Sequence, residues 1–360
     1  MNDNPRVRYI DAWRFYAIGL VIISHILEFS HSIYAEMLPG LIWRIHPLGP
    51  LGVYIFFCIS GYVICRGMIK EVAIYGTLSL RDFYLRRVLR IAPPLLLYLF
   101  VLGVMLHTGM IETTVPQLIQ SGLFLCNIDL AGQCGWYVGH TWSLAFEEQF
   151  YVVFPLIFVG MRIAAKRRKL LPVIGALLAA VVLAHLAQQA ALADYLSMFG
   201  YMLWGCAFAL YEDLLRPLLK RMPMALWCGL CALLIGVNFV ALPMFLMEGI
   251  YPLVAPVIIC AVVFGTPLHQ PLVGKLFGHA WLTYLGQISY TIYLWQQVAT
   301  ADHGFTSPFV VFALLGGVVL LAHVSYQYVE RPLIRLGRRW SSRRDDAVTP
   351  GVPIADARGA

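Results

Sequence analysis

The chain has 360 residues, of which 60% are hydrophobic and only 12% are charged, and its formal net charge is +7. Ordinary soluble domains have about twice this share of charged residues, and so few charges cannot cover the surface of a soluble protein. The composition therefore excludes a soluble enzyme, a disordered chain and a nucleic-acid-binding protein. It predicts an all-α fold, a polytopic bundle of membrane-spanning helices.

Apolar stretches of about 17–25 residues, long enough to cross a bilayer as helices, recur along the chain. We predict about ten transmembrane helices, at residues 9–29, 48–66, 91–110, 142–161, 170–187, 195–212, 223–243, 251–267, 281–300 and 308–329. A shorter apolar segment, 115–126, is expected to be re-entrant or to lie at the membrane surface. The first stretch contains Asp11 and Arg14 and has no small-residue cleavage site, so we interpret it as a retained helix and not as a signal peptide.

Basic residues are concentrated in alternate loops of this map. If the N-terminus is cytoplasmic, the inner segments are 1–8, 66–90, 162–169, 213–222, 268–280 and 330–360, and they hold 24 of the 26 Lys and Arg residues. Cytoplasmic loops of membrane proteins carry such an excess, so we predict that both termini are cytoplasmic. Topology and contact with anionic lipid headgroups then explain the positive charge. We expect residues 1–335 to form the membrane domain and 336–360 to form a basic, disordered cytoplasmic tail.

Two pairs of cysteines are close in the sequence. Cys126 and Cys134 lie in the same predicted outer loop and can form a disulfide if that compartment is oxidising. Cys228 and Cys231 lie inside the seventh apolar stretch with no histidine or second pair nearby, so a metal or redox role is disfavoured. We expect no metal site.

The first apolar stretch is interrupted by polar residues, namely Asp11, Arg14, His25 and Glu28. At 100° per residue, Arg14 and His25 differ by about 20° in direction, and the other two lie one turn away from them, so all share one stripe of the helix. Charged groups inside a span cost about 2.5–3.5 kcal/mol each, so the stripe indicates a polar cavity. The alternative is an interfacial Asp11–Arg14 ion pair and a His25 that only packs.

The third stretch is preceded by a basic segment with Arg81, Arg86, Arg87 and Arg90. Arg81 and Arg86 are typical of residues that anchor a helix at the cytoplasmic boundary. Arg87 and Arg90 are three residues apart on one helix face and lie nearest to the apolar stretch. A pair of guanidinium groups in this position suits a phosphate or pyrophosphate group.

The fourth stretch begins on the predicted outer side and contains Trp142, Glu147, Glu148 and Tyr151. Glu147 is expected about 7–8 Å below Trp142, which is roughly the depth of His25. A carboxylate and an imidazole that meet in a cavity can act as an acid–base pair. The alternative is an aromatic belt at Trp142 and Tyr151, with one of the glutamates capping the helix.

Six short motifs follow one another along the chain. They are Arg14 and His25 with ten residues between them, Phe56-Phe57-Cys58-Ile59-Ser60-Gly61-Tyr62, Arg87-Val88-Leu89-Arg90, Trp142-Ser143-Leu144 with Glu147 and Phe150-Tyr151, Gly286-Gln287-Ile288-Ser289-Tyr290-Thr291-Ile292-Tyr293-Leu294, and Glu330-Arg331-Pro332. In these residues and in their order, residues 5–335 resemble the acyltransferase 3 family of integral membrane acyltransferases.

The resemblance implies transfer of an acyl group, in many members acetyl, from acyl-coenzyme A to a hydroxyl of a carbohydrate or glycolipid, as in O-acetylation of a surface polysaccharide. Acyl-CoA, with acetyl-CoA as the expected form, is then the donor substrate, and no cofactor is bound permanently. The resemblance also implies a multi-pass protein of the bacterial cytoplasmic (inner) membrane. Lipopolysaccharide sugars, exopolysaccharide, a lipid-linked intermediate and smaller acceptors all stay open, as does the length of the acyl chain.

Roles for the site residues follow from this resemblance and from the predicted topology. The phosphates of cytoplasmic coenzyme A should meet Arg14, Arg87 and Arg90, whereas His25 should accept the proton of the acceptor hydroxyl and Glu147 should orient His25 or hold the sugar. We expect a polar passage to join the arginines to His25. Residues expected to line this passage or to bind the acceptor are Asp11, Ser60, Tyr62, Trp142, Ser143, Tyr151 and Tyr293.

The chain departs from the family at Trp295-Gln296-Gln297, where many members have a histidine, so the role of Gln296 is open. Some relatives are fused to an extracytoplasmic esterase-like domain, for which 360 residues leave no room. We therefore expect either that the membrane domain completes the transfer alone or that a separate protein does so.

A second hypothesis is a transporter or flippase that moves a glycolipid or organic acid without catalysis, because an intramembrane charged stripe also suits transport. Against it, the sequence has no paired halves with Gly- or Pro-broken helices, which inverted-repeat transporters tend to have. A third hypothesis, a signalling bundle, has no supporting motif.

Overall fold

The computed structural model describes residues 5–29, 48–128, 134–163, 166–187, 189–240, 250–301 and 308–342. Regular structure in these residues is entirely helical, which confirms the all-α prediction. The helices are α1 (Pro5–Phe29), α4 (Leu48–Tyr75), α5 (Leu80–His107), α6 (Val115–Gly122), α7 (Trp136–Gly139), α8 (Thr141–Gly160), α9 (Leu170–Leu186), α10 (Ala190–Leu210), α11 (Glu212–Lys220), α12 (Met224–Gly236), α13 (Tyr251–Phe264), α14 (Pro271–Gly278), α15 (Ala280–Gln287), α16 (Ser289–Ala299), α17 (Pro308–Ser325) and α18 (Arg331–Ser342). Short 3-10 turns at Arg167–Lys169 and Val237–Phe239 and a π-helical turn at Tyr326–Glu330 lie between them.

Each of the ten predicted stretches is helical over most of its described residues. By length and composition, four helical segments in this part of the chain can cross a membrane, and these are Leu48–Tyr75, Leu80–His107, Trp136–Gly160 and Phe312–Ser341. There is a fifth if α11 and α12, which meet at a bend of 107°, count as one span. The apolar helices indicate an integral membrane protein, whereas the count of ten and the side of each terminus stay predictions.

Helix α4 continues to Tyr75 and α5 begins at Leu80, so both extend beyond the apolar stretches predicted for them. Two further boundaries differ from the structure. The ninth stretch is two helices, α15 and α16, separated at Ile288, whose backbone N–H closes the last turn of α15. Gly286 weakens the helix in that turn, because glycine loses the most backbone freedom on folding. The second difference is in α18, which packs against α5 and continues past residue 335 to Ser342, so the first part of the expected tail is helical. Residues 343–360 lie outside the described residues.

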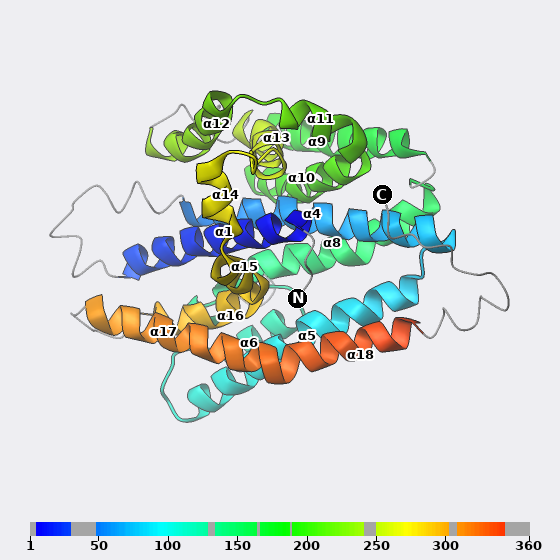
Figure 1. Cartoon of the computed structure of the whole chain (residues 1–360). Helices are drawn as coiled ribbons and strands as arrows, with labels where there is room; N and C mark the ends of the chain where they lie inside the picture. The colour runs from blue at the N-terminus through cyan, green and yellow to red at the C-terminus, as the bar shows by residue number, and fades with distance from the viewer. Residues whose placement is uncertain are drawn as a thin grey trace.

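The long helices lie side by side, with α4 at the centre of the bundle (Figure 1). Helix α4 packs against α1 and against α10, and α1 also packs against α15. Helix α10 in turn packs against α9 and α13. The α4–α5 turn and the end of α18 lie at the same end of the bundle, on the right of Figure 1, as expected for two segments on one side of a membrane.

Glycines allow neighbouring helices to touch backbone to backbone. A Cβ atom at Gly61 of α4 would lie 1.9 Å from the backbone oxygen of Met202 in α10, and one at Gly286 of α15 would lie 1.7 Å from that of Asp11 in α1. Neither contact leaves room for a methyl group, so any larger residue would push the helices apart. These two motif glycines therefore hold the helices that carry Ser60 and Asp11 against their neighbours.

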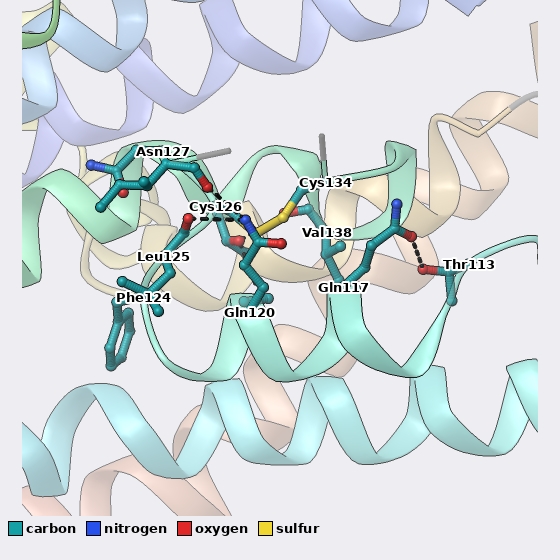
Figure 2. The surroundings of a disulfide bond; sticks show 12 residues. Thr113, Gln117, Gln120, Phe124, Leu125, Cys126, Asn127, Cys134 and Val138 are labelled. Atoms are coloured by element: carbon teal, nitrogen blue, oxygen red, sulfur yellow. Dashed lines mark hydrogen bonds between the residues drawn. A yellow bond between two sulfur atoms is a disulfide. The ribbon is translucent and has the colours of Figure 1, made fainter. Parts of the chain in front are cut away.

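A disulfide joins Cys126 to Cys134 beside α6 (Figure 2). The predicted cysteine pair is thus confirmed. The same loop is tied to α8, because Asn127 and Gln149 form two hydrogen bonds of 2.9 and 3.0 Å between their side-chain amides. Helix α6 begins with a capping box at Thr114 and is 8 residues long, too short to cross a bilayer, as its sequence predicts.

Removing this disulfide is expected to destabilise the protein. The crosslink closes a loop with a sequence separation of 8, and loss of such a constraint costs about 2–3 kcal/mol in the chain-entropy account. The double variant Cys126→Ser/Cys134→Ser should therefore unfold at a lower temperature than the wild type in the same detergent. Cys228→Ser, at an exposed position, is the control, and equal melting temperatures for the two variants would contradict the prediction.

Candidate active site

Helices α1, α4, α5, α8, α15 and α16 surround a cavity of about 80 Å³. Its lining is Arg14 of α1; Val53, Phe56, Phe57 and Ser60 of α4; Arg87, Arg90 and Ile91 of α5; Ser143, Leu144 and Glu147 of α8; Gln287 of α15; and Ser289, Tyr290 and Tyr293 of α16. Predicted site residues from five helices are therefore brought together, namely Arg14, Ser60, Arg87, Arg90, Ser143, Glu147 and Tyr293.

Two of the cavity arginines have carboxylate partners. Arg14 lies 3.7 Å from Asp11, one turn earlier on α1, and the other oxygen of Asp11 accepts a hydrogen bond of 3.3 Å from Gln287. Arg87 lies 3.8 Å from Glu148, and its guanidinium carbon is 3.5 Å from the centre of the Tyr151 ring. Both ion pairs are longer than a hydrogen bond, so neither saturates its guanidinium. Asp11 and Tyr151 support the cavity arginines and are not part of the cavity wall.

Arg90 lies among charged groups of both signs. It interacts electrostatically with Arg14 and Arg87 as well as with Asp11, Glu148 and Glu330. Glu330, which is buried at the end of the π-helical turn, accepts a hydrogen bond from the hydroxyl of Thr291 on α16. The Glu-Arg-Pro motif thus supplies a buried carboxylate that links the start of α18 to the helix behind the cavity.

Hydroxyl groups and a carboxylate also line the cavity. Ser60 donates a hydrogen bond of 2.5 Å to Glu147, which places the two side chains as a pair across α4 and α8. The hydroxyls of Ser143 and Tyr293 are 2.7 Å apart, and Tyr293 donates to the backbone oxygen of His140 at 2.6 Å. The cavity thus combines guanidinium groups with a carboxylate and several hydroxyls, a set that can bind an anion at one side and orient a reacting carbonyl or hydroxyl at the other.

His25 is not among the residues that line this cavity. Its Nδ1 lies 3.1 Å from Oε1 of Gln296, and its ring contacts Trp136 edge-on, with the ring centres 5.4 Å apart. On α1, the buried side chains of Ile18 and Val21 occupy the turns between Arg14 and His25.

The expected polar passage from the arginines to His25 stays a prediction. The hydrogen bonds found for His25 and Glu147 go to different side chains, since Ser60 donates to Glu147 and His25 pairs with Gln296. Helix α16 nevertheless connects the two places: Gln296 follows Tyr293 by three residues, which is one helical turn or about 4–5 Å along the axis. His25 thus lies one turn of α16 beyond the cavity wall.

Three further expectations concern residues outside the cavity. The Trp142 ring packs on Phe57 and Phe146, with ring centres 6.3 and 6.0 Å away, and so belongs to an aromatic cluster. Tyr62 lines a second cavity, of about 500 Å³, that α11 and the end of α13 border. The side chain of Glu28, the last member of the predicted stripe, lies outside the described residues.

Some residues of the site are not singled out by the sequence. Gln287, Ser289 and Tyr290 line the cavity, and only their position inside a motif string signals this. Gln296 and Trp136 contact His25 from parts of the chain that no local pattern connects to it, since His25 and Gln296 are 271 residues apart in sequence.

Curated relatives share low but extended similarity with the chain. A Bacillus subtilis (strain 168) protein provisionally named a peptidoglycan O-acetyltransferase is 28% identical over 339 residues, which cover 82% of this chain and 52% of that protein. Peptidoglycan O-acetyltransferase OatA of Listeria monocytogenes is 26% identical over 331 residues, covering 80% and 52%. The chain thus spans about half the length of these relatives.

No solved structure matches the chain. The family model described as an acyltransferase domain matches residues 7–328, from the start of α1 into the π-helical turn before α18. This match includes every residue that lines the cavity, as well as His25 and Gln296. The chain therefore belongs to the acyltransferase 3 family.

Proposed function

We propose that the protein is a membrane O-acyltransferase that moves an acyl group, in the first instance acetyl, from acyl-CoA to a hydroxyl of a carbohydrate or glycolipid acceptor. The observation that carries this proposal is the cavity in which Arg14, Arg87 and Arg90 face Glu147 and Tyr293 inside the helical bundle. Membership of the family supports acyl transfer, and the names of the relatives, peptidoglycan O-acetyltransferases, favour a carbohydrate of the cell envelope as the acceptor.

The donor is assigned to the arginines because coenzyme A carries several phosphate charges. Guanidinium groups bind phosphate through paired, charge-assisted hydrogen bonds. Nε of Arg87 faces Oε1 of Glu148 at 3.8 Å, which is too long for a hydrogen bond, so this carboxylate does not saturate the guanidinium. With the phosphates at the arginines, the pantetheine arm is assigned to the rest of the cavity, where Ser143 and Tyr293 also line the wall.

Transfer then needs a base for the acceptor hydroxyl, and His25 is assigned this role. His25 removes the proton as the hydroxyl oxygen attacks the thioester carbonyl, the new C–O bond forms, and the C–S bond breaks. The proton passes from the imidazolium to the leaving thiolate of coenzyme A, so atoms and charges balance. Glu147, which accepts a hydrogen bond from Ser60, is assigned to substrate binding inside the cavity, where it holds the pantetheine arm of the donor or the acceptor sugar.

The direct test is an acyl-transfer assay on membranes that contain the protein. Membranes are incubated with acetyl-CoA radiolabelled in the acetyl group, and alkali-labile, acid-stable label is counted in the lipid and polysaccharide fractions. Label above that of membranes without the protein is the expected result. Label equal to that background, with the protein present in the membrane, would rule out O-acyl transfer and favour transport without catalysis.

Replacing Arg87 by alanine is expected to weaken donor binding. A hydrogen bond to a charged group contributes about 1.5–3 kcal/mol, which corresponds to a rise in the KM for acetyl-CoA of roughly 10–100-fold. The turnover number at saturating donor should change less than KM. Arg81→Ala, at an exposed position of the same helix, is the matched control and should leave KM unchanged. Equal KM values for the two variants would remove Arg87 from the donor site.

A further inference from the structure

The hydrogen bond between His25 and Gln296 joins a half-buried imidazole to a fully buried amide. Gln296 projects from α16 one turn after Tyr293, and its Oε1 lies 3.1 Å from Nδ1 of His25. A neutral imidazole has one nitrogen that donates and one that accepts, and the partner of the first nitrogen decides which is which. The orientation of the Gln296 amide therefore determines where the proton of His25 is.

The neighbours of Gln296 fix this orientation. Its Nε2 donates a hydrogen bond of 2.8 Å to Oε1 of Gln297. The hydroxyl of Thr300 donates to the backbone oxygen of Gln296 at 3.0 Å and lies 3.4 Å from Oε1 of the same residue. Turning this amide over alone would place its oxygen against Oε1 of Gln297 without a proton between them. The backbone oxygen of Gln297 is itself held by the indole N–H of Trp136 at 3.0 Å, which ties this part of α16 to α7.

We propose that Gln296 is a positioning residue that keeps the proton of His25 on Nδ1 and thereby makes Nε2 the basic atom. Nδ1–H donates to the amide oxygen, so the lone pair of the neutral ring is on Nε2. An orienting partner of this kind is what a histidine base requires, because the wrong tautomer presents an N–H to the group that must be deprotonated. The catalytic consequence rests on the proposed function, whereas the tautomer does not.

A neutral amide fixes the tautomer without adding charge. A carboxylate in its place would stabilise the imidazolium and keep the base protonated to a higher pH. Trp136, Gln296, Gln297 and Thr300 are not titratable near neutral pH. One titratable side chain that interacts electrostatically with His25 is His140 at the start of α8. On the acid side of the pH profile, the pH at which activity falls should therefore change when the residue at position 296 is replaced.

The tautomer can be read without any activity. In lipid bilayers, ¹⁵N NMR of the protein labelled at its histidines distinguishes a protonated from an unprotonated ring nitrogen, and the signals of His25 are assigned by their loss in His25→Asn. The expected wild-type spectrum at neutral pH has His25 protonated at Nδ1. Gln296→Leu, which keeps the bulk but removes the acceptor, should lose this preference. A wild-type ring protonated at Nε2 would overturn the proposal.

The catalytic consequence is read from pH profiles of the turnover number. Gln296→Leu should lower turnover by roughly 10-fold or more, without a change in the KM for acetyl-CoA. In Gln296→Glu the acid limb should move to higher pH by about one unit, because the carboxylate stabilises the protonated ring. A profile of Gln296→Glu identical to the wild type would overturn the positioning role, since a purely structural residue shifts stability and not the acid limb.

Gln120→Leu provides a matched control. Gln120 is also a buried amide, but it donates to the backbone oxygens of Leu125 and Ile128 in the loop after α6. Its variant should keep the wild-type acid limb, and a shift there equal to that of Gln296→Glu would contradict the assignment. If the NMR signals show the Nδ1–H form and membranes transfer no label, the proposed function fails and the role of Gln296 in fixing the tautomer stands.

Discussion

Replacing His25 by alanine is expected to lower acyl transfer by about 10²–10⁴-fold, which is the usual contribution of a general base. The loss should appear in the turnover number and not in the KM for acetyl-CoA, because the arginines assigned to the donor lie in the cavity and His25 lies one turn beyond it. Initial rates of label transfer at several donor concentrations separate the two quantities. The variant should accumulate in the membrane like the wild type.

His107→Ala is the control for this experiment. His107 is exposed at the end of α5 and has no contact with the cavity residues, so its variant should transfer label at the wild-type rate. Wild-type transfer by His25→Ala would mean that another group accepts the proton. The family membership of the chain would not change in that case, but the path of the proton proposed here would be wrong.

Replacing Gly286 by alanine is expected to destabilise the bundle more than most single substitutions. The added Cβ would lie 1.7 Å from the backbone oxygen of Asp11, and a backbone atom cannot rotate away as a side chain can. Overpacking of this kind costs about 1–3 kcal/mol when side chains can adjust, and more when a helix must move. Gly61→Ala should behave similarly, because its Cβ would lie 1.9 Å from the backbone oxygen of Met202.

Gly67→Ala separates packing from helix propensity. Gly67 lies on α4, like Gly61, but a Cβ there would meet no atom within 4 Å. Alanine is favoured over glycine inside a helix by about 1 kcal/mol, so this variant should match or exceed the wild-type melting temperature. Melting of the purified proteins in one detergent gives the comparison. If Gly286→Ala melted as high as Gly67→Ala, the close approach of α15 to α1 would be refuted.

Much of the secondary structure follows from the sequence because it depends on local apolar content. The helix Thr141–Gly160 appears where its apolar stretch predicts it, and Leu80–His107 contains most of the stretch predicted at 91–110 but begins earlier. The break at Ile288 was not predicted, because the apolar residues continue through it. The glycine before the break, Gly286, contacts α1, and this contact is not visible in the sequence. An apolar stretch therefore predicts that a segment is buried or in the membrane, but it does not predict where the helix is interrupted.

Some members of the cavity were predictable from the sequence, whereas its contacts were not. Charged residues in apolar helices are costly, so Arg14, Arg87 and Glu147 could be selected from the sequence, and the structure brings them to one cavity. Which carboxylate accompanies which cation depends on helix rotation. Glu148, the neighbour of Glu147, faces Arg87, whereas Glu147 faces Ser60.

Helix α1 is clamped on two sides along its first half. A Cβ at Gly52 of α4 would lie 2.4 Å from the backbone oxygen of Ala17, and the contact of Gly286 with Asp11 is closer still. Helix α1 therefore cannot shift without disturbing α4 and α15. A rearrangement that brings an acyl group and His25 together is expected in side chains, which rotate faster than helices move collectively.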